Sequence, residues 1–147
     1  MAERNDWWTC PTDSEDGRLI IVSGRRDIDS FRNNPKFNIR VEITWRYSDA
    51  PDATMPDEST SEIMGEVTDA LNDVFDKDPI AVMTGIYTGA GERNWVFYTL
   101  STNIFNKKLN EALSPFPILP ITIYAENDPE WLEYAEMREL SEIVADD

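Results

Sequence analysis

Two stretches of the chain show the alternation of apolar and polar positions that is typical of β-strands. From Phe37 to Tyr47 the apolar residues occupy every second position, which predicts a strand with one buried face. From Ile80 to Leu100 two runs of β-branched and aromatic residues flank Gly89-Ala90-Gly91. Because glycine adopts the positive φ angles of a tight turn, we expect a central antiparallel hairpin in this stretch.

Helical spacing appears between these two strand regions. Apolar residues from Ile63 to Phe75 form one stripe at the helical period, which predicts a helix from about Thr60 to Asp76. The expected N-cap is one of three hydroxyl residues, Ser59, Thr60 or Ser61. The acidic residues that lie off the stripe are expected on the solvent face: Glu62, Glu66, Asp69 and Asp73.

The chain after the hairpin predicts a helix, a strand and a last helix. The first helix starts at Thr102 or Asn103 and ends near Leu113, before two prolines. The segment Pro120 to Glu126 has the composition of a strand, with proline at its first position. Asp128-Pro129-Glu130 is a helix start, with Asp128 as cap and Pro129 as the first helical residue, and this helix reaches about Val144.

The N-terminal part is expected to add a second, shorter hairpin. Asp6 to Cys10 and Arg18 to Ser23 are strand candidates, and the residues between them favour a turn. The polar segment Arg25 to Pro35 is expected to be a loop.

The order of elements predicts an α+β fold. From residue 37 it is strand, helix, strand, strand, helix, strand, which is the ferredoxin-like β-α-β-β-α-β order, a two-layer sandwich of two helices on an antiparallel sheet. We expect one domain with three parts: an N-terminal hairpin and loop (1–36), a ferredoxin-like core (37–126) and a C-terminal acidic helix (127–147). The hairpin and the last helix are expected to extend the sheet or to cover its open face.

The charge of the chain narrows the choice of partners. The 147 residues include 29 acidic and 13 basic ones, for a net charge of −16, and residues 49–147 carry all of this excess. Direct nucleic-acid binding is not expected, because it needs basic residues for the phosphates. The acidic excess allows a basic protein as partner, or mimicry of nucleic acid toward a nucleic-acid-binding protein, while the simpler and favoured interpretation is a soluble protein with an acidic surface. The oligomeric state stays open.

Membrane and targeting segments are not expected. The sequence shows no apolar run of membrane-spanning length and no signal-peptide pattern at its start. Its single cysteine, Cys10, suits a reducing compartment, so the expected location is the cytoplasm.

The chain offers few groups for catalysis. It has no histidine, which removes the commonest general base and metal ligand. The turn Thr88-Gly89-Ala90-Gly91-Glu92-Arg93 lacks the ending of a phosphate-binding loop. We therefore expect no catalytic residues, no metal and no cofactor.

Aromatic residues and Arg93 are the better candidates for a binding site. Five tryptophans are more than so small a domain is expected to bury completely, and tryptophan, tyrosine and arginine are enriched at interfaces. Arg93 is expected either to anchor an acidic ligand or to pair with Asp128. The candidates for ligand or partner contact are Trp8, Arg93, Trp95, Tyr98, Asp128, Trp131 and Tyr134.

Several short motifs together resemble a known family. They are Asp6 and Trp8, then Met55-Pro56 before the first long helix, then Thr88, Gly89, Gly91, Arg93, Phe97 and Tyr98, and last Asp128, Pro129, Glu130, Trp131 and Tyr134. In their order and spacing they resemble the bacterial domain of unknown function 695, over roughly Asp6 to Met137. That family has no established activity, so the resemblance implies no catalytic residue.

The resemblance also carries one hint of function. Members of this family are sometimes joined to a domain similar to the regulator of ribonuclease E activity B, a small acidic inhibitor. We expect no such domain in this chain, so the association only suggests protein binding. The chain departs from the usual ending of the family, because an acidic helix from Arg138 to Asp147 follows the last motif.

Three functions follow as hypotheses. The first is a non-enzymatic protein-interaction or regulatory module, and the second is a small-ligand-binding domain or enzyme with a pocket formed by Arg93 and aromatic residues. The third is an immunity-type inhibitor of a basic toxin or nuclease. Independently of these, Asp128 is expected to cap the last helix, and Trp131 to pack on the sheet or on the Trp7-Trp8 segment.

Overall fold

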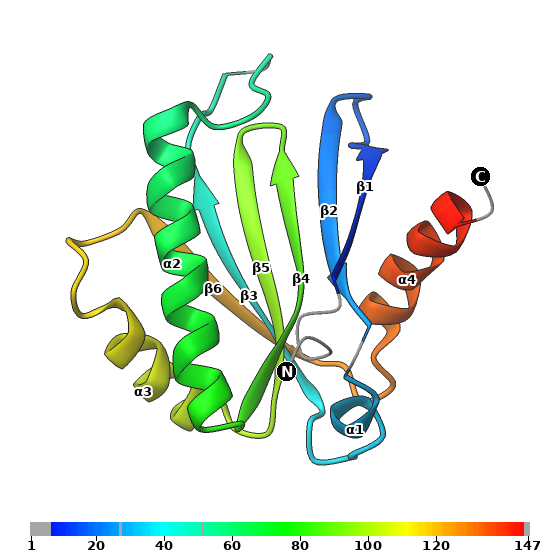
Figure 1. Cartoon of the computed structure of the whole chain (residues 1–147), viewed down its shortest axis with the longest axis vertical. Helices are drawn as coiled ribbons and strands as arrows, with labels where there is room; N and C mark the ends of the chain where they lie inside the picture. Colours follow the sequence, from blue (N-terminus) through cyan, green and yellow to red (C-terminus); the bar gives the residue numbers. More distant parts are fainter. Residues whose placement is uncertain (1–6, 27, 51, 146–147) are drawn as a thin grey trace.

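The computed structural model describes residues 7–26, 28–50 and 52–145, which form an antiparallel sheet with helices on both of its faces (Figure 1). The strands are β1 (Trp7–Asp13), β2 (Leu19–Arg25), β3 (Ile39–Arg46), β4 (Ala81–Gly89), β5 (Glu92–Thr99) and β6 (Ile121–Asn127). The helices of the described part are α1 (Asp29–Arg32), α2 (Glu58–Lys77), α3 (Thr102–Leu113) and α4 (Leu132–Ala145). The predicted α+β class is confirmed.

The six strands form one sheet in the order β1-β2-β4-β5-β3-β6, with every neighbouring pair antiparallel. The expected central hairpin is β4–β5, and its turn needs glycine: φ is +149° at Gly89 and +90° at Gly91. A side chain at Gly91 would also meet the carbonyl oxygen of Ser48. The expected N-terminal hairpin is β1–β2, and it extends the sheet through pairing of β2 with β4.

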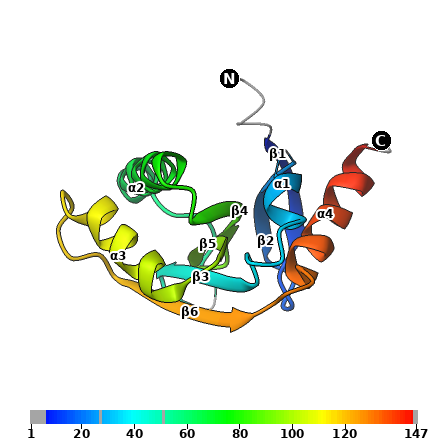
Figure 2. The ribbon, with the colours of Figure 1, turned by 90° about the horizontal axis from the view of Figure 1, so that it is seen from below.

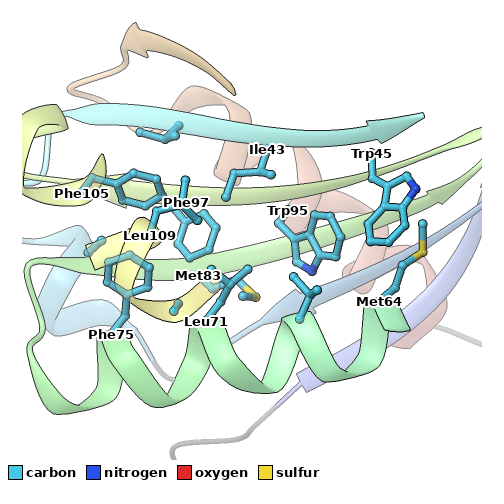
Figure 3. Close-up of a cluster of buried hydrophobic side chains, with 14 residues drawn as sticks. Ile43, Trp45, Met64, Leu71, Phe75, Met83, Trp95, Phe97, Phe105 and Leu109 are labelled. Atoms are coloured by element: carbon cyan, nitrogen blue, oxygen red, sulfur yellow. The ribbon is translucent and has the colours of Figure 1, made fainter. Parts of the chain in front are cut away.

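Helices α2 and α3 cover one face of the sheet, above β3, β4 and β5 (Figure 2). The apolar stripe of α2 packs onto this face from Val67 to Phe75 as its periodicity predicts, but at its start Met64 is buried and the predicted Ile63 is exposed. Figure 3 shows Met64, Leu71 and Phe75 of α2 facing the side chains of the strands. The rings of Phe75, Phe97 and Phe105 pack together with centroids 5.1–5.3 Å apart. This cluster is the larger hydrophobic core.

Helix α4 lies on the opposite face, against β1, β2 and β4 (Figure 2). Adjacent strand residues point to opposite faces, so Phe97 belongs to the first core while Tyr98 belongs to this second one. Phe37 also packs here, although the alternation placed it with the other face, because it precedes the first residue of β3, Ile39. The added C-terminal helix therefore covers part of the open face, as expected.

Three local predictions are wrong. The segment 25–35 is not only a loop, because it contains the end of β2 and the short helix α1. The cap of α2 is Asp57, whose carboxylate accepts a hydrogen bond from the Thr60 N–H at 2.8 Å. Helix α4 begins at Leu132 rather than at Pro129, since Pro129 and Glu130 form a turn and Trp131 adopts a left-handed φ of +55°.

Within the described ranges, no helix is both long enough and apolar enough to cross a bilayer.

Candidate functional site

A groove of about 560 Å³ lies between α2 and the strands β2 and β4, and we call it the α2 groove. Its apolar lining comes from Ile21, Met55, Pro56 and Ile86. Its polar lining comes from Ser23, Ser61, Thr68, Asp69, Thr88 and Arg93, with Gly65 on the helix side. The volume is within the range of small-molecule sites, and a mixed lining of this kind suits a ligand with an apolar body and a polar head.

Strand β5 presents Arg93 to this groove. Arg93 and Thr88 are partners in the β4–β5 register, so they lie side by side, and the Arg93 Nε–H donates a hydrogen bond to Thr88 Oγ1 at 2.9 Å. The guanidinium lies 5.9 Å from the centre of the Trp95 ring. These two contacts hold the side chain in place and leave both terminal nitrogens of the fork for another acceptor.

The charge of Arg93 is not neutralised by a carboxylate within the described part of the chain. The ion pairs of Arg18, Arg40, Arg46 and Lys108 in this part do not include Arg93. Burial lowers the pKa of the Arg93 guanidinium, and the nearby Tyr47 opposes this effect. Arginine stays protonated in proteins even so, and the groove therefore holds a half-buried positive charge in a chain of net charge −16.

The expected pocket of Arg93 and aromatic residues does not form. Trp95 and Phe97 are fully buried in the core under α2, and Tyr98 is fully buried on the other face. Trp95 lies behind the wall of the groove, where its Nε1–H donates to Thr68 Oγ1 at 2.8 Å. The apolar part of the lining of the α2 groove comes from non-aromatic side chains instead.

The predicted pairing of Arg93 with Asp128 is also wrong, because Asp128 lies in a separate network on the α4 side of the sheet. Its carboxylate accepts hydrogen bonds from the Tyr98 hydroxyl at 2.6 Å and from the backbone N–H groups of Leu132 and Glu133 at 2.9 and 3.2 Å. The Arg40 guanidinium lies 3.5 Å away. The expected capping of the last helix by Asp128 is therefore confirmed, although Asp128 acts from four residues before the helix starts.

This network sets the protonation of Asp128. Burial alone would raise the pKa of the carboxyl, but the hydrogen bonds from Tyr98, Leu132 and Glu133 and the charge of Arg40 outweigh it, so the pKa of Asp128 is lowered. Burial and the bond to Asp128 raise the pKa of Tyr98. The pair is thus a phenol donating to an ionised carboxylate at neutral pH.

Trp131 and Tyr134 complete the attachment of α4. The Trp131 ring stacks on Tyr98 with centroids 4.0 Å apart, which confirms its expected packing on the sheet, and its Nε1–H donates to the Phe37 carbonyl at 2.7 Å. The Tyr134 hydroxyl donates to the Arg25 carbonyl at 2.5 Å. Trp8, at 6% exposure, packs in the same core.

Six of the seven candidate contact residues lie in the interior of the protein. Trp8, Trp95, Tyr98, Trp131 and Tyr134 are each buried, as is the carboxylate of Asp128, so none of them offers a surface to a ligand or partner in this conformation. Their burial instead fastens helices to the sheet. Arg93 is the candidate that the structure places in a groove.

Glu133 and Arg40 were not singled out by the sequence. Glu133 accepts a hydrogen bond from the Tyr87 hydroxyl at 2.5 Å, and its other carboxylate oxygen is buried without a hydrogen-bond partner among the described residues. Burial raises the pKa of Glu133, and Glu42 and Asp128 add to this effect. No sequence signal separated Glu133 from the other acidic residues of the last helix.

Residues for metal or thiol chemistry are not brought together in the described ranges. Groups of three or more His, Cys, Asp or Glu side chains arranged to hold a metal ion are not found there. Cys10 is 2% exposed, and burial raises the pKa of its thiol, which opposes formation of the reactive thiolate.

The sequence profile of a family of unknown function, DUF695, matches residues 6–137. The chain belongs to the DUF695 family. Searches of curated proteins and of solved structures find no match.

In this DUF695 member the motif residues gather at two places. Met55, Pro56, Thr88 and Arg93 line the α2 groove, although 36 residues lie between Pro56 and Arg93 in the sequence. Asp128, Trp131 and Tyr134 meet Tyr98 and Trp8 in the core below α4. The second group has a structural role that its contacts explain, so the first group is the better functional candidate.

Proposed function

We propose that this DUF695 protein is a non-enzymatic binding module and that the α2 groove binds a small ligand with an anionic head, such as a carboxylate or phosphate group. The observation that carries the proposal is the half-buried guanidinium of Arg93, which has no carboxylate partner in the described part of the chain. A partly desolvated charge that lacks a counter-charge is costly to maintain, and an anion bound at the fork would compensate it.

The surroundings of Arg93 support this ligand class. Its Nε–H is used by Thr88, so the two terminal nitrogens can form a bidentate pair with a carboxylate. The side chains of Ile21, Ile86 and Met55 offer contacts to an apolar tail. The acidic remainder of the chain disfavours non-specific anion binding. Saturable binding of an anion would therefore indicate a specific site.

A titration monitored by NMR tests this function. Hexanoate and inorganic phosphate serve as probes, and the Nε–Hε signal of Arg93 reports contact at the guanidinium. We expect a saturable shift that is larger for hexanoate, and binding weaker by about tenfold or more in Arg93→Gln, the loss expected for hydrogen bonds to a charged group. Arg93→Lys should bind with intermediate affinity, because it keeps the charge and loses the fork.

Arg46→Gln is the matched control, since Arg46 is an exposed arginine on β3 that pairs with Glu92. It should bind the probes as the wild type does. Equal affinities in Arg93→Gln and the wild type, or a shift that never saturates, would remove the proposal. Circular dichroism of each variant shows whether it is folded.

A second candidate function is docking of a basic protein, and the outer face of α2 favours it. Glu58, Glu62, Glu66, Asp69 and Asp73 are exposed and spaced three or four residues apart, so they form one row along the helix. A row of this kind favours rapid association with a basic surface. An immunity-type inhibitor of a basic toxin or nuclease is a specific form of this candidate.

Affinity capture from lysate at low and moderate salt tests the second candidate. Partners bound through the row should be lost at moderate salt and lost from a variant with Glu62→Gln, Glu66→Gln and Asp73→Asn. A control with Glu136→Gln and Glu139→Gln, two exposed positions of α4, should keep them. Captured proteins whose binding is unchanged by moderate salt and by the α2 substitutions would count against this candidate.

We also infer a ferredoxin-like core and a cytoplasmic location. The order β4-β5-β3-β6, with α2 and α3 on one face, supports the former. The single cysteine supports the latter, and fractionation of cells that express the tagged protein tests it.

A further inference from the structure

Strand β6 forms one edge of the sheet and is paired on one side only, with β3 (Figure 2). Alternate residues of such an edge direct N–H and C=O groups outward, where another strand can bind them. The opposite edge, β1, carries Pro11 in its middle, which lacks the N–H that a further strand would need. The β6 edge has seven residues, no proline, no lysine and a regular register with β3.

The segment that ends in β6 carries most of the large hydrophobic side chains that are exposed among the described residues. Of the eight large hydrophobic side chains that are exposed there, five lie between residues 100 and 124: Leu100, Ile104, Ile118, Ile123 and Tyr124. Ile123 and Tyr124, both on β6, are 47% and 53% exposed. A hollow of about 450 Å³ separates α3 from this strand, with Phe105, Leu109 and Ile123 in its lining.

The charge of this region differs from that of the rest of the chain. From Leu100 to the end of β6 the charged residues are Lys107, Lys108, Glu111 and Glu126, for a net charge of zero, so the other residues carry the whole charge of −16. Two copies of so acidic a chain repel each other at most orientations. The β6 side is where they can approach without a concentration of like charge.

We propose that the β6 edge is a homodimer interface, in which β6 of a second copy pairs with it antiparallel about a two-fold axis at Tyr124. This register pairs all seven residues of each strand. It sets Tyr124 against the partner's Tyr124, Ile123 against the partner's Ala125, and Thr122 against the partner's Glu126. The two residues of each pair then point to the same face of the sheet, and no two like charges are directly opposed. The partner's Ile123 covers the open side of the hollow beside α3.

A pair of charge variants at the axis tests this arrangement. Tyr124→Lys and Tyr124→Glu each set two like charges opposite one another, so each variant alone should dimerise at least about tenfold more weakly than the wild type. An equimolar mixture should recover the dimer, because Lys then faces Glu. Light scattering after size exclusion and sedimentation velocity give the masses.

Leu132→Lys is the matched control: Leu132 is similarly exposed, at 61%, but lies outside the proposed interface at the start of α4. It should leave the dimer intact. Since Tyr124→Lys makes the chain less acidic, greater overall repulsion cannot explain its dissociation. A wild type that stays monomeric at high concentration overturns the proposal, as does a dimer that survives both Tyr124 substitutions or a mixture that stays monomeric.

Discussion

Replacing Asp128 by alanine is expected to cost more than the loss of a helix cap. An Asp cap contributes about 0.5–2 kcal/mol to stability. Asp128→Ala also removes the acceptor of the Tyr98 hydroxyl, which is buried, and a buried polar group without a partner costs about 1–3 kcal/mol. Arg40 keeps Glu42 and Glu126 as partners, so its charge adds little to the loss. We expect the free energy of unfolding to fall by about 1.5–5 kcal/mol in total.

Asp57→Ala is the matched control for this experiment. Asp57 caps α2 from an exposed position, where its carboxylate accepts hydrogen bonds from the Thr60 N–H and from the exposed Ser59 hydroxyl, so its loss should cost no more than a cap. Trp131→Ala gives the upper reference at about 3–5 kcal/mol, because it empties a fully buried site. The sequence alone predicts that Trp131→Ala destabilises the protein clearly more than Asp128→Ala. The hydrogen bonds of Asp128 in the structure reduce the expected difference between these two variants.

Urea unfolding followed by circular dichroism measures all three variants. Because the pKa of Asp128 is lowered in the folded state, its ionised carboxylate stabilises the fold fully above pH about 3.9 and loses this effect as the pH falls through the lowered pKa. The difference between Asp128→Ala and the wild type should therefore shrink under strongly acidic conditions. A loss at neutral pH no larger than that of Asp57→Ala would refute the argument that Asp128 couples β5 to α4.

Two further predictions concern the α4 side of the sheet. Glu133→Gln should raise the free energy of unfolding at neutral pH, because burial raises the pKa of Glu133 and so disfavours its ionised form. This gain in stability should vanish below pH about 4.3, where the carboxyl is protonated in both the folded and the unfolded protein. Urea midpoints at neutral and acidic pH check this, and a variant less stable than the wild type at neutral pH would contradict it. Gly24→Ala should cost about 1–3 kcal/mol, because a Cβ at Gly24 would overlap the Trp8 ring. Gly65→Ala, where the added Cβ meets open space, is its control, and equal thermal stability of the two would contradict the overlap.

Short-range patterns in the sequence determined most of the elements. Alternation located β3, the glycine-flanked turn located β4 and β5, and the apolar stripe located α2, each within a few residues of its observed bounds. These predictions succeed because each pattern reflects which side of one element is buried. The capping role of Asp128 was also predictable, since a cap is a local hydrogen bond. The helix begins at Leu132 rather than at Pro129, because Trp131 adopts a left-handed conformation and stacks on Tyr98.

Contacts between distant residues were decided only by the tertiary structure. Which aromatic residues are buried, and that Arg93 pairs with Thr88 rather than with Asp128, depends on which strands are neighbours and which face each residue takes. The α2 groove exists because the β1–β2 hairpin joins the sheet beside β4 and brings Ile21 opposite the polar side of α2. The same strand order leaves β6 at an open edge, and periodicity within one strand cannot reveal that, because it reports a buried face and not a missing neighbour.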